Sequence, residues 1–318
     1  MTERPLAGQS LLAVFAHPDD ESLACGGLLA WCVQRGVRVS LVCVTPGQWG
    51  GEAEGAGERR AESRRRELRA AADVLGLADV TVLGFEDGML PWAGELADTI
   101  GEQLRTQAPD VVVTFDADGL YWHPDHIAVH TATTAAVAGA ATPPALYYVT
   151  MSPDAMRGMV EAVAARVGHE APFVVLGVTD VDAIGAQAPA PSLKVDVRAQ
   201  AERKLAAIRC HQSQLAGSPF PLMTASEAES WLRTEYLRRA PVGADGDALV
   251  VGIDRMLGAQ GLSFAVGIQG GHQQPSAGQE RGRGARPRSV RVASVATVAV
   301  TALRTVPQAK STTVTGTG

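Results

Sequence analysis

Leu11-Leu12-Ala13-Val14-Phe15-Ala16-His17-Pro18-Asp19-Asp20-Glu21 is the stretch that decides the fold. It begins as an apolar run of strand length and ends with a histidine and three carboxylates where a helical pattern starts. His123-Pro124-Asp125-His126 repeats the arrangement, because it follows the apolar run Val111–Phe115 and opens another helical pattern. Imidazole nitrogen and carboxylate oxygen suit zinc and related divalent ions, and a catalytic site leaves one position for water. The two corners therefore predict two halves of one metal site.

Apolar runs rich in β-branched residues alternate with helical patterns along the chain. The runs are Leu11–Phe15, Val37–Thr45, Val80–Phe85, Val111–Phe115, Ala145–Met151 and Phe173–Val178. This alternation predicts an α/β fold, Rossmann-like, with a mostly parallel sheet and helices on both faces. In such an open sheet the first and fourth strands flank the point where strand order reverses, and ligands bind at their carboxyl ends. His17 and His123 follow those two strands.

Two helices have predicted ends. Gly36 is expected to end the helix that starts near Asp20, and Gly76 the helix that runs from about Glu58 to Leu75. One face of the second helix carries Ala61, Arg64, Leu68, Ala71 and Leu75. An apolar stripe normally faces the core, so Arg64 is expected to point inward, where it needs an anionic or hydrogen-bonding partner.

Composition limits the class of protein. Four cysteines without C-x-x-C spacing, and no secretory signal before them, indicate a reduced, cytoplasmic setting. No apolar run is long enough to span a bilayer, so no membrane partner is expected. The net charge is −6, and the main body is acidic, which argues against nucleic acid as a partner. Oligomerisation stays open.

The motifs together resemble the LmbE/PIG-L family of zinc-dependent de-N-acetylases. The resemblance rests on Ala16–Glu21, His123–His126, Arg64 with Glu67-Leu68 ahead of Leu75-Gly76, Asp87-Gly88, and Lys204 with His211–Gln214. It covers roughly residues 10 to 240 and implies an LmbE-like fold. The implied activity is removal of the N-acetyl group from an N-acetylglucosamine-type sugar conjugate, of which thiol-cofactor precursors of the mycothiol and bacillithiol type are examples.

The resemblance implies the ligands of the metal. By the family pattern, His17, Asp20 and His126 hold one divalent ion. A corner that enters the first turn of a helix can bring His17 and Asp20, three residues apart, to one ion. Asp19, which projects differently from Asp20, is the implied general base that takes a proton from bound water. Zinc is the simplest ion, with iron or another divalent ion as alternatives.

The second motif supplies further implied roles. His123 would deliver a proton to the departing nitrogen, and Asp125 would orient a histidine rather than bind the metal. Tyr121 matches a family position whose hydroxyl can donate to the developing oxyanion, and a half-buried loop aromatic is the alternative. His130 shares a helix face with His126 and could compete as a ligand, but the family pattern favours a packed or surface histidine.

Four further residues are candidates for contact with the substrate or for support of its pocket. Arg64 and Asp87 match family positions that line the pocket, although a salt bridge to a nearby carboxylate explains Arg64 equally well. Trp49, in the glycine-rich loop 46–55, offers a flat surface on which a sugar ring could stack, and a plain surface loop is the alternative. His211 is expected to give structural support or to form a pocket wall.

The resemblance stops near Arg255. Residues 273–318 hold seven basic residues and one acidic residue in a Gly-, Gln- and Arg-rich sequence followed by a Val/Thr/Ser tail. We therefore divide the chain into a deacetylase domain, 1–255, and a low-complexity basic tail, 256–318, predicted to be disordered. The competing interpretation gives Val290–Leu303 a place as an edge strand or as a cover for the pocket.

Two other functional classes compete with the deacetylase. A non-catalytic sugar- or nucleotide-binding α/β module predicts a broken motif, yet Asp19 and His123 are both present. Another metal hydrolase, such as a phosphoesterase, would want a second metal or basic phosphate clamps, which the acidic body disfavours. The expected partner is therefore a small N-acetylated sugar conjugate.

Overall fold

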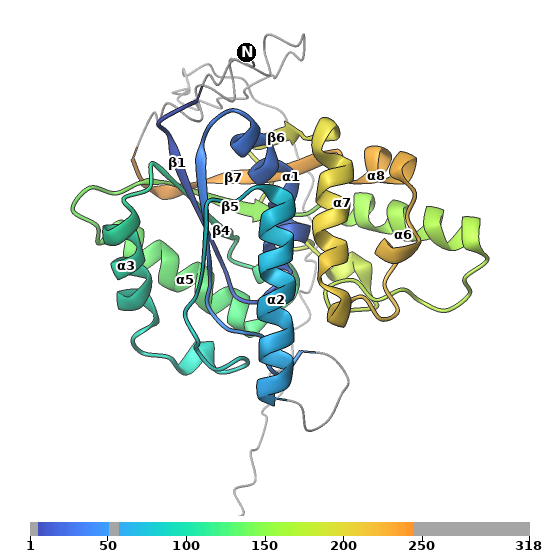
Figure 1. The fold of residues 1–318 in the computed structure, drawn as a ribbon, viewed down its shortest axis with the longest axis horizontal. Helices are drawn as coiled ribbons and strands as arrows, with labels where there is room; N and C mark the ends of the chain where they lie inside the picture. The colour runs from blue at the N-terminus through green and yellow to red at the C-terminus, as the bar shows by residue number, and fades with distance from the viewer. Residues whose placement is uncertain (1–5, 51–56, 245–318) are drawn as a thin grey trace, which may run out of the picture. The chain divides into compact units, whose positions relative to one another are not determined.

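The computed structural model describes residues 6–50 and 57–244, in which seven strands form one sheet of order β3-β2-β1-β4-β5-β7-β6 (Figure 1). The strands are β1 (Ser10–Phe15), β2 (Arg38–Cys43), β3 (Asp79–Val82), β4 (Val111–Phe115), β5 (Ala145–Thr150), β6 (Leu193–Asp196) and β7 (Thr234–Gly243). β1 to β5 pair in parallel, and β7 is antiparallel to both β5 and β6. The predicted mostly parallel α/β sheet is confirmed.

Two groups of helices cover the sheet. The helices are α1 (Asp20–Gln34), α2 (Gly57–Leu75), α3 (Leu96–Gln107), α4 (Gly119–Trp122), α5 (Pro124–Ala138), α6 (Pro153–Val167), α7 (Ala201–Cys210) and α8 (Ala225–Trp231). α1, α2 and α7 pack against one another, and α3 packs against α5 on the other side of the sheet (Figure 1).

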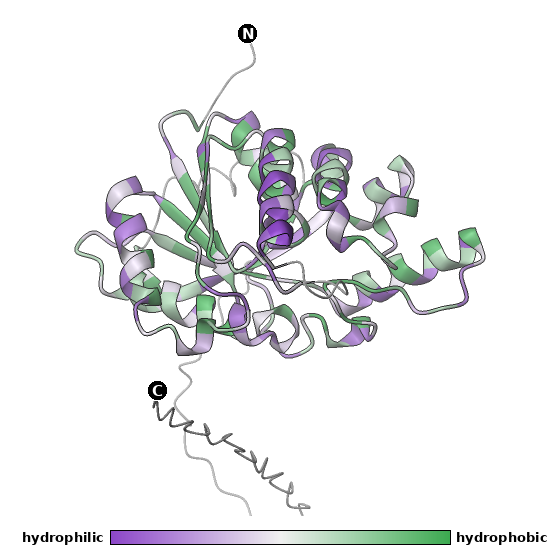
Figure 2. Ribbon diagram, turned by 60° about the horizontal axis from the view of Figure 1, so that its bottom comes forward, coloured by the Kyte–Doolittle hydropathy of each residue, from purple (hydrophilic) through white to green (hydrophobic). Residues whose placement is uncertain are grey.

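The core lies between these helices and the central strands. Every residue of β4 is buried, as are Leu11–Phe15 of β1, and the rings of Phe15 and Phe115 meet edge to face at 4.9 Å. Strands covered on both faces need apolar side chains on both, which explains the continuous apolar runs in the sequence. Figure 2 shows these strands as hydrophobic and much of the long helix α2 as hydrophilic.

The predicted helix ends are confirmed. α1 ends at Gln34 and α2 at Leu75, and Gly36 and Gly76 follow them with φ of 92° and 83°. Glycine has no Cβ, so it adopts this left-handed backbone at little cost and ends the helix there.

The predicted strand Phe173–Val178 is wrong. Leu176 and Gly177 have φ of 53° and 77°, and the chain turns back so that Val175 and Val178 exchange backbone hydrogen bonds. Phe173 and Val175 are nonetheless buried, so the run has the apolar content of a strand without its extended backbone. The sixth and seventh strands come instead from Leu193–Asp196 and Thr234–Gly243, which the sequence pattern did not indicate.

No helix within residues 6–50 and 57–244 is long and apolar enough to cross a membrane. Residues 256–318 lie outside the described residues, as does Val290–Leu303. The boundary at 255 and the disorder of the tail therefore stay predictions.

Candidate metal centre

The centre lies at the carboxyl ends of the two central strands. β1 and β4 pair directly, with Leu11 opposite Val111 and Ala13 opposite Val113, so the corners that follow them are neighbours. His17 comes from the first corner and His126 from the first turn of α5, 109 residues later. The sheet therefore joins the two half-sites at the predicted reversal of strand order.

Three side chains present donor atoms to one point. His17 Nδ1 lies 3.1 Å from His126 Nε2, and the Asp20 carboxylate oxygens lie 3.5 Å from His17 Nδ1 and 3.3 Å from His126 Nε2. Two atoms bound tetrahedrally to zinc, each at about 2.0–2.1 Å, are about 3.3 Å apart. The donor spacing therefore fits a single divalent ion.

The opposite ring nitrogens are held by hydrogen-bond acceptors. His17 Nε2 lies 3.2 Å from Asp125 Oδ2 and 3.0 Å from Asp87 Oδ1, and His126 Nδ1 lies 3.0 Å from the Gly119 carbonyl. Such partners fix which nitrogen carries the proton and leave the other free to bind a metal. Asp125 thus sits where an orienting carboxylate belongs, and Asp87, expected beside the substrate, contacts the same histidine.

Two other donor groups occur among the described residues. One is His17, His123 and His126, and the other is His17, Asp87 and Asp125. In the second group Trp49 donates a backbone N–H to Asp87 and Gly88 donates one to Asp125, just as His17 donates its backbone N–H to Asp20. We favour the group with Asp20, because its carboxylate faces His17 Nδ1 and His126 Nε2 together, whereas Asp87 and Asp125 both face His17 Nε2.

Asp20 and its neighbour Asp19 are in different electrostatic environments. Burial alone would raise the pKa of Asp20, but His126 and His17 outweigh it and lower this pKa well below its usual value. For Asp19, burial raises the pKa to about 6, with Arg64 opposing the rise and the Asp20 charge adding to it. Asp20 is therefore ionised at neutral pH, as a ligand must be, and Asp19 titrates in the range useful for a general base.

Arg64 points inward as expected and is 3% exposed. Its guanidinium lies 3.3 Å from Asp19 Oδ2 and donates to the Pro18 and Gly47 carbonyls. Of the two interpretations of Arg64, the salt bridge is the one that the geometry shows.

His123 and Tyr121 border the cluster. The His123 ring centroid lies 4.9 Å from that of His17 and 4.6 Å from that of His126, and Tyr121 lies 5.3 Å from His126. Burial, with the adjacent His126 and His17, lowers the pKa of His123 to about 4. Its Nδ1 accepts the Asp125 N–H, so the proton of the neutral ring is on Nε2. Burial raises the pKa of Tyr121, which keeps its hydroxyl proton as a donor.

Trp49, His130 and His211 occupy distinct places. Trp49 is 59% exposed, while its backbone N–H donates to Asp87. His130 turns away from the cluster, because its Nδ1 bonds to the Phe115 carbonyl at 2.9 Å. His211 contacts Glu21, the residue that follows Asp20 in sequence: its Nε2 lies 2.9 Å from Glu21 Oε1.

Glu21 received no role from the sequence. It is 1% exposed and accepts hydrogen bonds from Ser22, His211 and the Asp19 backbone. Its position directly after two site aspartates was the available signal, but an acidic residue in the first turn of a helix is common because it favours the helix dipole.

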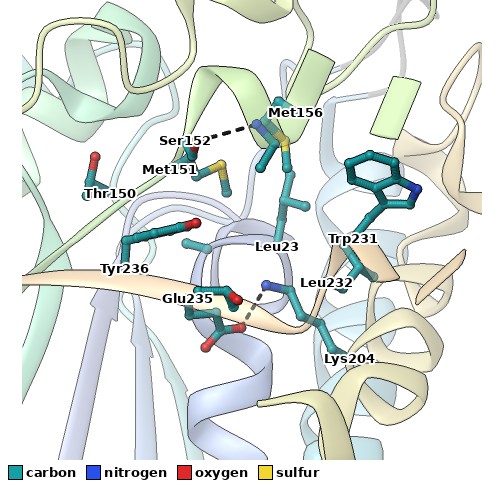
Figure 3. Close-up of a pocket in the computed structure, with 13 residues that line it drawn as sticks. Leu23, Thr150, Met151, Ser152, Met156, Lys204, Trp231, Leu232, Glu235 and Tyr236 are labelled. Carbon is teal, nitrogen blue, oxygen red and sulfur yellow. Dashed lines mark hydrogen bonds and ion pairs between the residues drawn. The ribbon is translucent and has the colours of Figure 1, made fainter. Parts of the chain in front are cut away.

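A pocket away from the cluster lies between α1, α8 and the strand β7 (Figure 3). Leu23, Met156, Trp231 and Tyr236 line it, together with the buried ion pair of Lys204 and Glu235, whose Nζ and Oε1 are 2.7 Å apart. The pair has a structural role, since Glu235 also accepts the backbone N–H groups of Gly27 and Leu28 in α1.

Solved structures share the fold. A conserved protein of Thermus thermophilus aligns with a TM-score of 0.51 and 24% identity, over 75% of this chain and 97% of the other. GalB, the 4-carboxy-2-hydroxymuconate hydratase of Pseudomonas putida, aligns with a TM-score of 0.54 and 18% identity, over 76% and 100%. Because one of these is a hydratase, the fold alone does not decide the reaction.

Sequence comparison is more specific. Residues 12–137 match the PIG-L family, described as GlcNAc-PI de-N-acetylase. A protein of Geodermatophilus obscurus, named 1D-myo-inositol 2-acetamido-2-deoxy-alpha-D-glucopyranoside deacetylase, is 34% identical over 269 residues, 72% of this chain and 90% of that protein. One of the same name from Acidothermus cellulolyticus is 32% identical over 286 residues, 77% and 96%. With the motifs joined at one centre, these matches show that the chain belongs to the PIG-L family.

Proposed function

We propose that the protein is a metal-dependent hydrolase that removes the acetyl group from an N-acetylglucosamine conjugate. The observation that carries the proposal is the spacing of His17, Asp20 and His126, which fits one ion, while the neighbouring Asp19 carboxylate interacts electrostatically with His17 and Asp20. Membership of the PIG-L family supports it. The names of the two relatives favour a substrate in which the sugar is joined to inositol.

We assign the metal to His17, Asp20 and His126 and propose zinc, for which two imidazoles and a carboxylate are a suitable donor set. Iron would suit the same donors. A divalent ion bound there would act as a Lewis acid on the amide carbonyl and would lower the pKa of water so that a nucleophile forms near neutral pH.

The chain itself handles the protons. Asp19 accepts the proton of the attacking water, and Arg64 holds its carboxylate at 3.3 Å. The departing amine takes up the proton that Asp19 accepted from the water, and His123 Nε2–H donates a hydrogen bond to the departing nitrogen, while the Tyr121 hydroxyl donates to the oxyanion. Asp125 keeps His17 in the tautomer whose Nδ1 faces the ion.

The exposed apolar side chains around the centre suit a substrate with rings. Trp49, Met89, Trp92 and Trp122 are all exposed and lie on the segments that follow β2, β3 and β4. We propose that Trp49 stacks on the sugar, because an indole face binds the apolar face of a ring. Arg64 and Asp87 are both buried, and we propose that they form the inner wall of the substrate site. Because the cysteines within residues 6–50 and 57–244 are free, we place the enzyme in the cytoplasm.

The test is acetate release by the purified protein from N-acetylglucosaminyl-inositol, with N-acetylglucosamine and a phosphate ester as comparison substrates. We expect activity that is lost on chelation and restored by zinc or iron, and metal content that is lost in His17→Ala and His126→Ala. Full activity of metal-free protein, or hydrolysis of the phosphate ester alone, would refute the proposal.

A further inference from the structure

The backbone of Asp19 is strained. Its φ is 123° and its ψ −27°, in a region that residues with a side chain rarely adopt. Such a conformation persists only where the surroundings impose it, and it concentrates at functional sites. The groups that hold Asp19 therefore decide where its carboxylate points.

Glu21 holds the backbone of Asp19 through a hydrogen bond. Glu21 Oε2 accepts the Asp19 N–H at 3.1 Å, which leaves Oε1 to face the interior. There Oε1 accepts from the Ser22 hydroxyl and lies 2.9 Å from His211 Nε2. Glu21 and His211 are each 1% exposed, and Glu21 belongs to none of the three donor groups described above.

The anchor comes from a distant part of the chain. His211 is the residue that follows α7, 190 residues after Glu21, and α7 packs along α1. A carboxylate held by a histidine at the end of a second helix cannot turn freely, so its bond to the Asp19 N–H has a fixed direction. Arg64 holds the Asp19 carboxylate on the other side.

We propose that Glu21, anchored by His211, is a positioning residue that fixes the backbone of Asp19 and so aims its carboxylate at the metal centre. This rests on the proposed function, in which Asp19 is the general base. Glu21 touches neither metal nor substrate in this role and acts only through Asp19.

The test is a double-mutant cycle on kcat, with KM and metal content measured for each protein. Glu21→Ala should lower kcat about 10- to 100-fold, the loss expected when a catalytic group is misplaced by about 1 Å. Metal content and KM should stay near the wild-type values. Glu21→Gln keeps an acceptor for the Asp19 N–H, and we expect its kcat within about threefold of wild type.

The decisive arm uses Asp19→Ala as the background. If Glu21 acts only through Asp19, Glu21→Ala lowers the residual kcat of this variant by less than about twofold, since groups that act as a unit are not additive. Glu235→Gln is the matched control: it changes a buried glutamate that accepts N–H bonds of α1 at Gly27 and Leu28 but not at Asp19. It should lower the melting temperature and leave the kcat of folded protein unchanged.

Each result has one meaning. An equal loss from Glu21→Ala in both backgrounds, or loss of metal in Glu21→Ala, overturns the positioning role and leaves the proposed function intact. A wild-type kcat in Asp19→Ala overturns the assignment of the base, and the positioning role with it. If circular dichroism shows that Glu21→Ala is unfolded, His211→Gln removes the anchor instead and is put through the same cycle with the same expected outcome.

Discussion

Two adjacent aspartates divide the chemistry of the centre. Asp20 faces two imidazoles and has a lowered pKa, whereas Asp19 is buried beside another carboxylate and has a pKa of about 6. Environments that separate the pKa values of neighbouring acids are how one site holds a fixed anion and a proton acceptor together.

Asp19→Ala should therefore keep the metal and lose activity. We expect kcat to fall about a hundredfold or more, the usual contribution of a general base, with metal content unchanged. Elemental analysis and steady-state kinetics on the same preparation check this. Loss of the metal would show that Asp19, and not Asp20, is the ligand.

Trp49 allows a separate test of substrate contact. Trp49→Ala should raise KM about three- to tenfold with kcat little changed, because one stacked ring pair contributes about 0.5–1.5 kcal/mol. Trp49→Phe should recover most of the affinity. An unchanged KM in Trp49→Ala would mean that the indole is simply an exposed loop residue.

The sequence predicted which residues belong to the centre but not the contacts between them. The two motifs identified His17, Asp20 and His126, and helix periodicity turned Arg64 inward. Periodicity could not choose between a substrate and a carboxylate as the partner of Arg64, because it gives the face of the helix and not what lies opposite; the Asp19 carboxylate lies there because of the backbone torsion at Asp19. The role of Glu21 depends on that torsion as well.

Among the elements, α1 is built in two parts. Its backbone is non-helical at Cys25, with φ of −149°, and a helical segment that starts afresh begins with N–H groups that need acceptors from outside it. Glu235 of β7 accepts two of them and is neutralised by Lys204 of α7 (Figure 3). Glu235, 208 residues after Gly27, therefore caps the second part of α1 from the strand β7.

The glycine pair Gly26-Gly27 gives a matched test. A Cβ at Gly27 would lie 2.6 Å from Val197 Cγ2 and 2.9 Å from Glu235 Oε1, whereas at Gly26 the nearest atoms are at 3.6 Å. Gly27→Ala should lower the free energy of unfolding by about 1–3 kcal/mol, as overpacking does. Gly26→Ala should be neutral or stabilising by up to about 1 kcal/mol. Denaturant unfolding of both variants checks this, and equal effects would contradict it.

The elements also show where local pattern fails. Phe173–Val178 has the composition of a strand, yet its left-handed residues close a tight turn. Composition reports burial, which this segment has, and not the backbone path. β6 and β7 are mostly only partly buried, and pairing with each other and with β5 gives them their place in the sheet.

At the scale of the whole molecule, the fold was the most predictable feature and the least informative about the reaction. Alternating strands and helices specify the sheet, and the order of its strands specifies where a ligand binds. A hydratase shares the fold, so the fold alone does not decide the chemistry.

Truncation after Arg255 tests the division of the chain. It removes none of the site residues and nothing from β7, which ends at Gly243. If residues 256–318 are a disordered appendage, the melting temperature and kcat/KM of the truncated protein should match those of the full chain. A large drop in either would make the tail part of the fold.

The direct pairing of β1 with β4 has a consequence for how the protein acquires its metal. Leu11 and Val111 are partners across a loop of about one hundred residues, and closing such a loop is a slow, late step in folding. In the native protein that pairing places the corners that carry His17 and His126 side by side. An ion held by His17 and His126 would bind the paired sheet and stabilise it by mass action, so we expect metal supply to affect how long the native protein lasts more than how fast it forms.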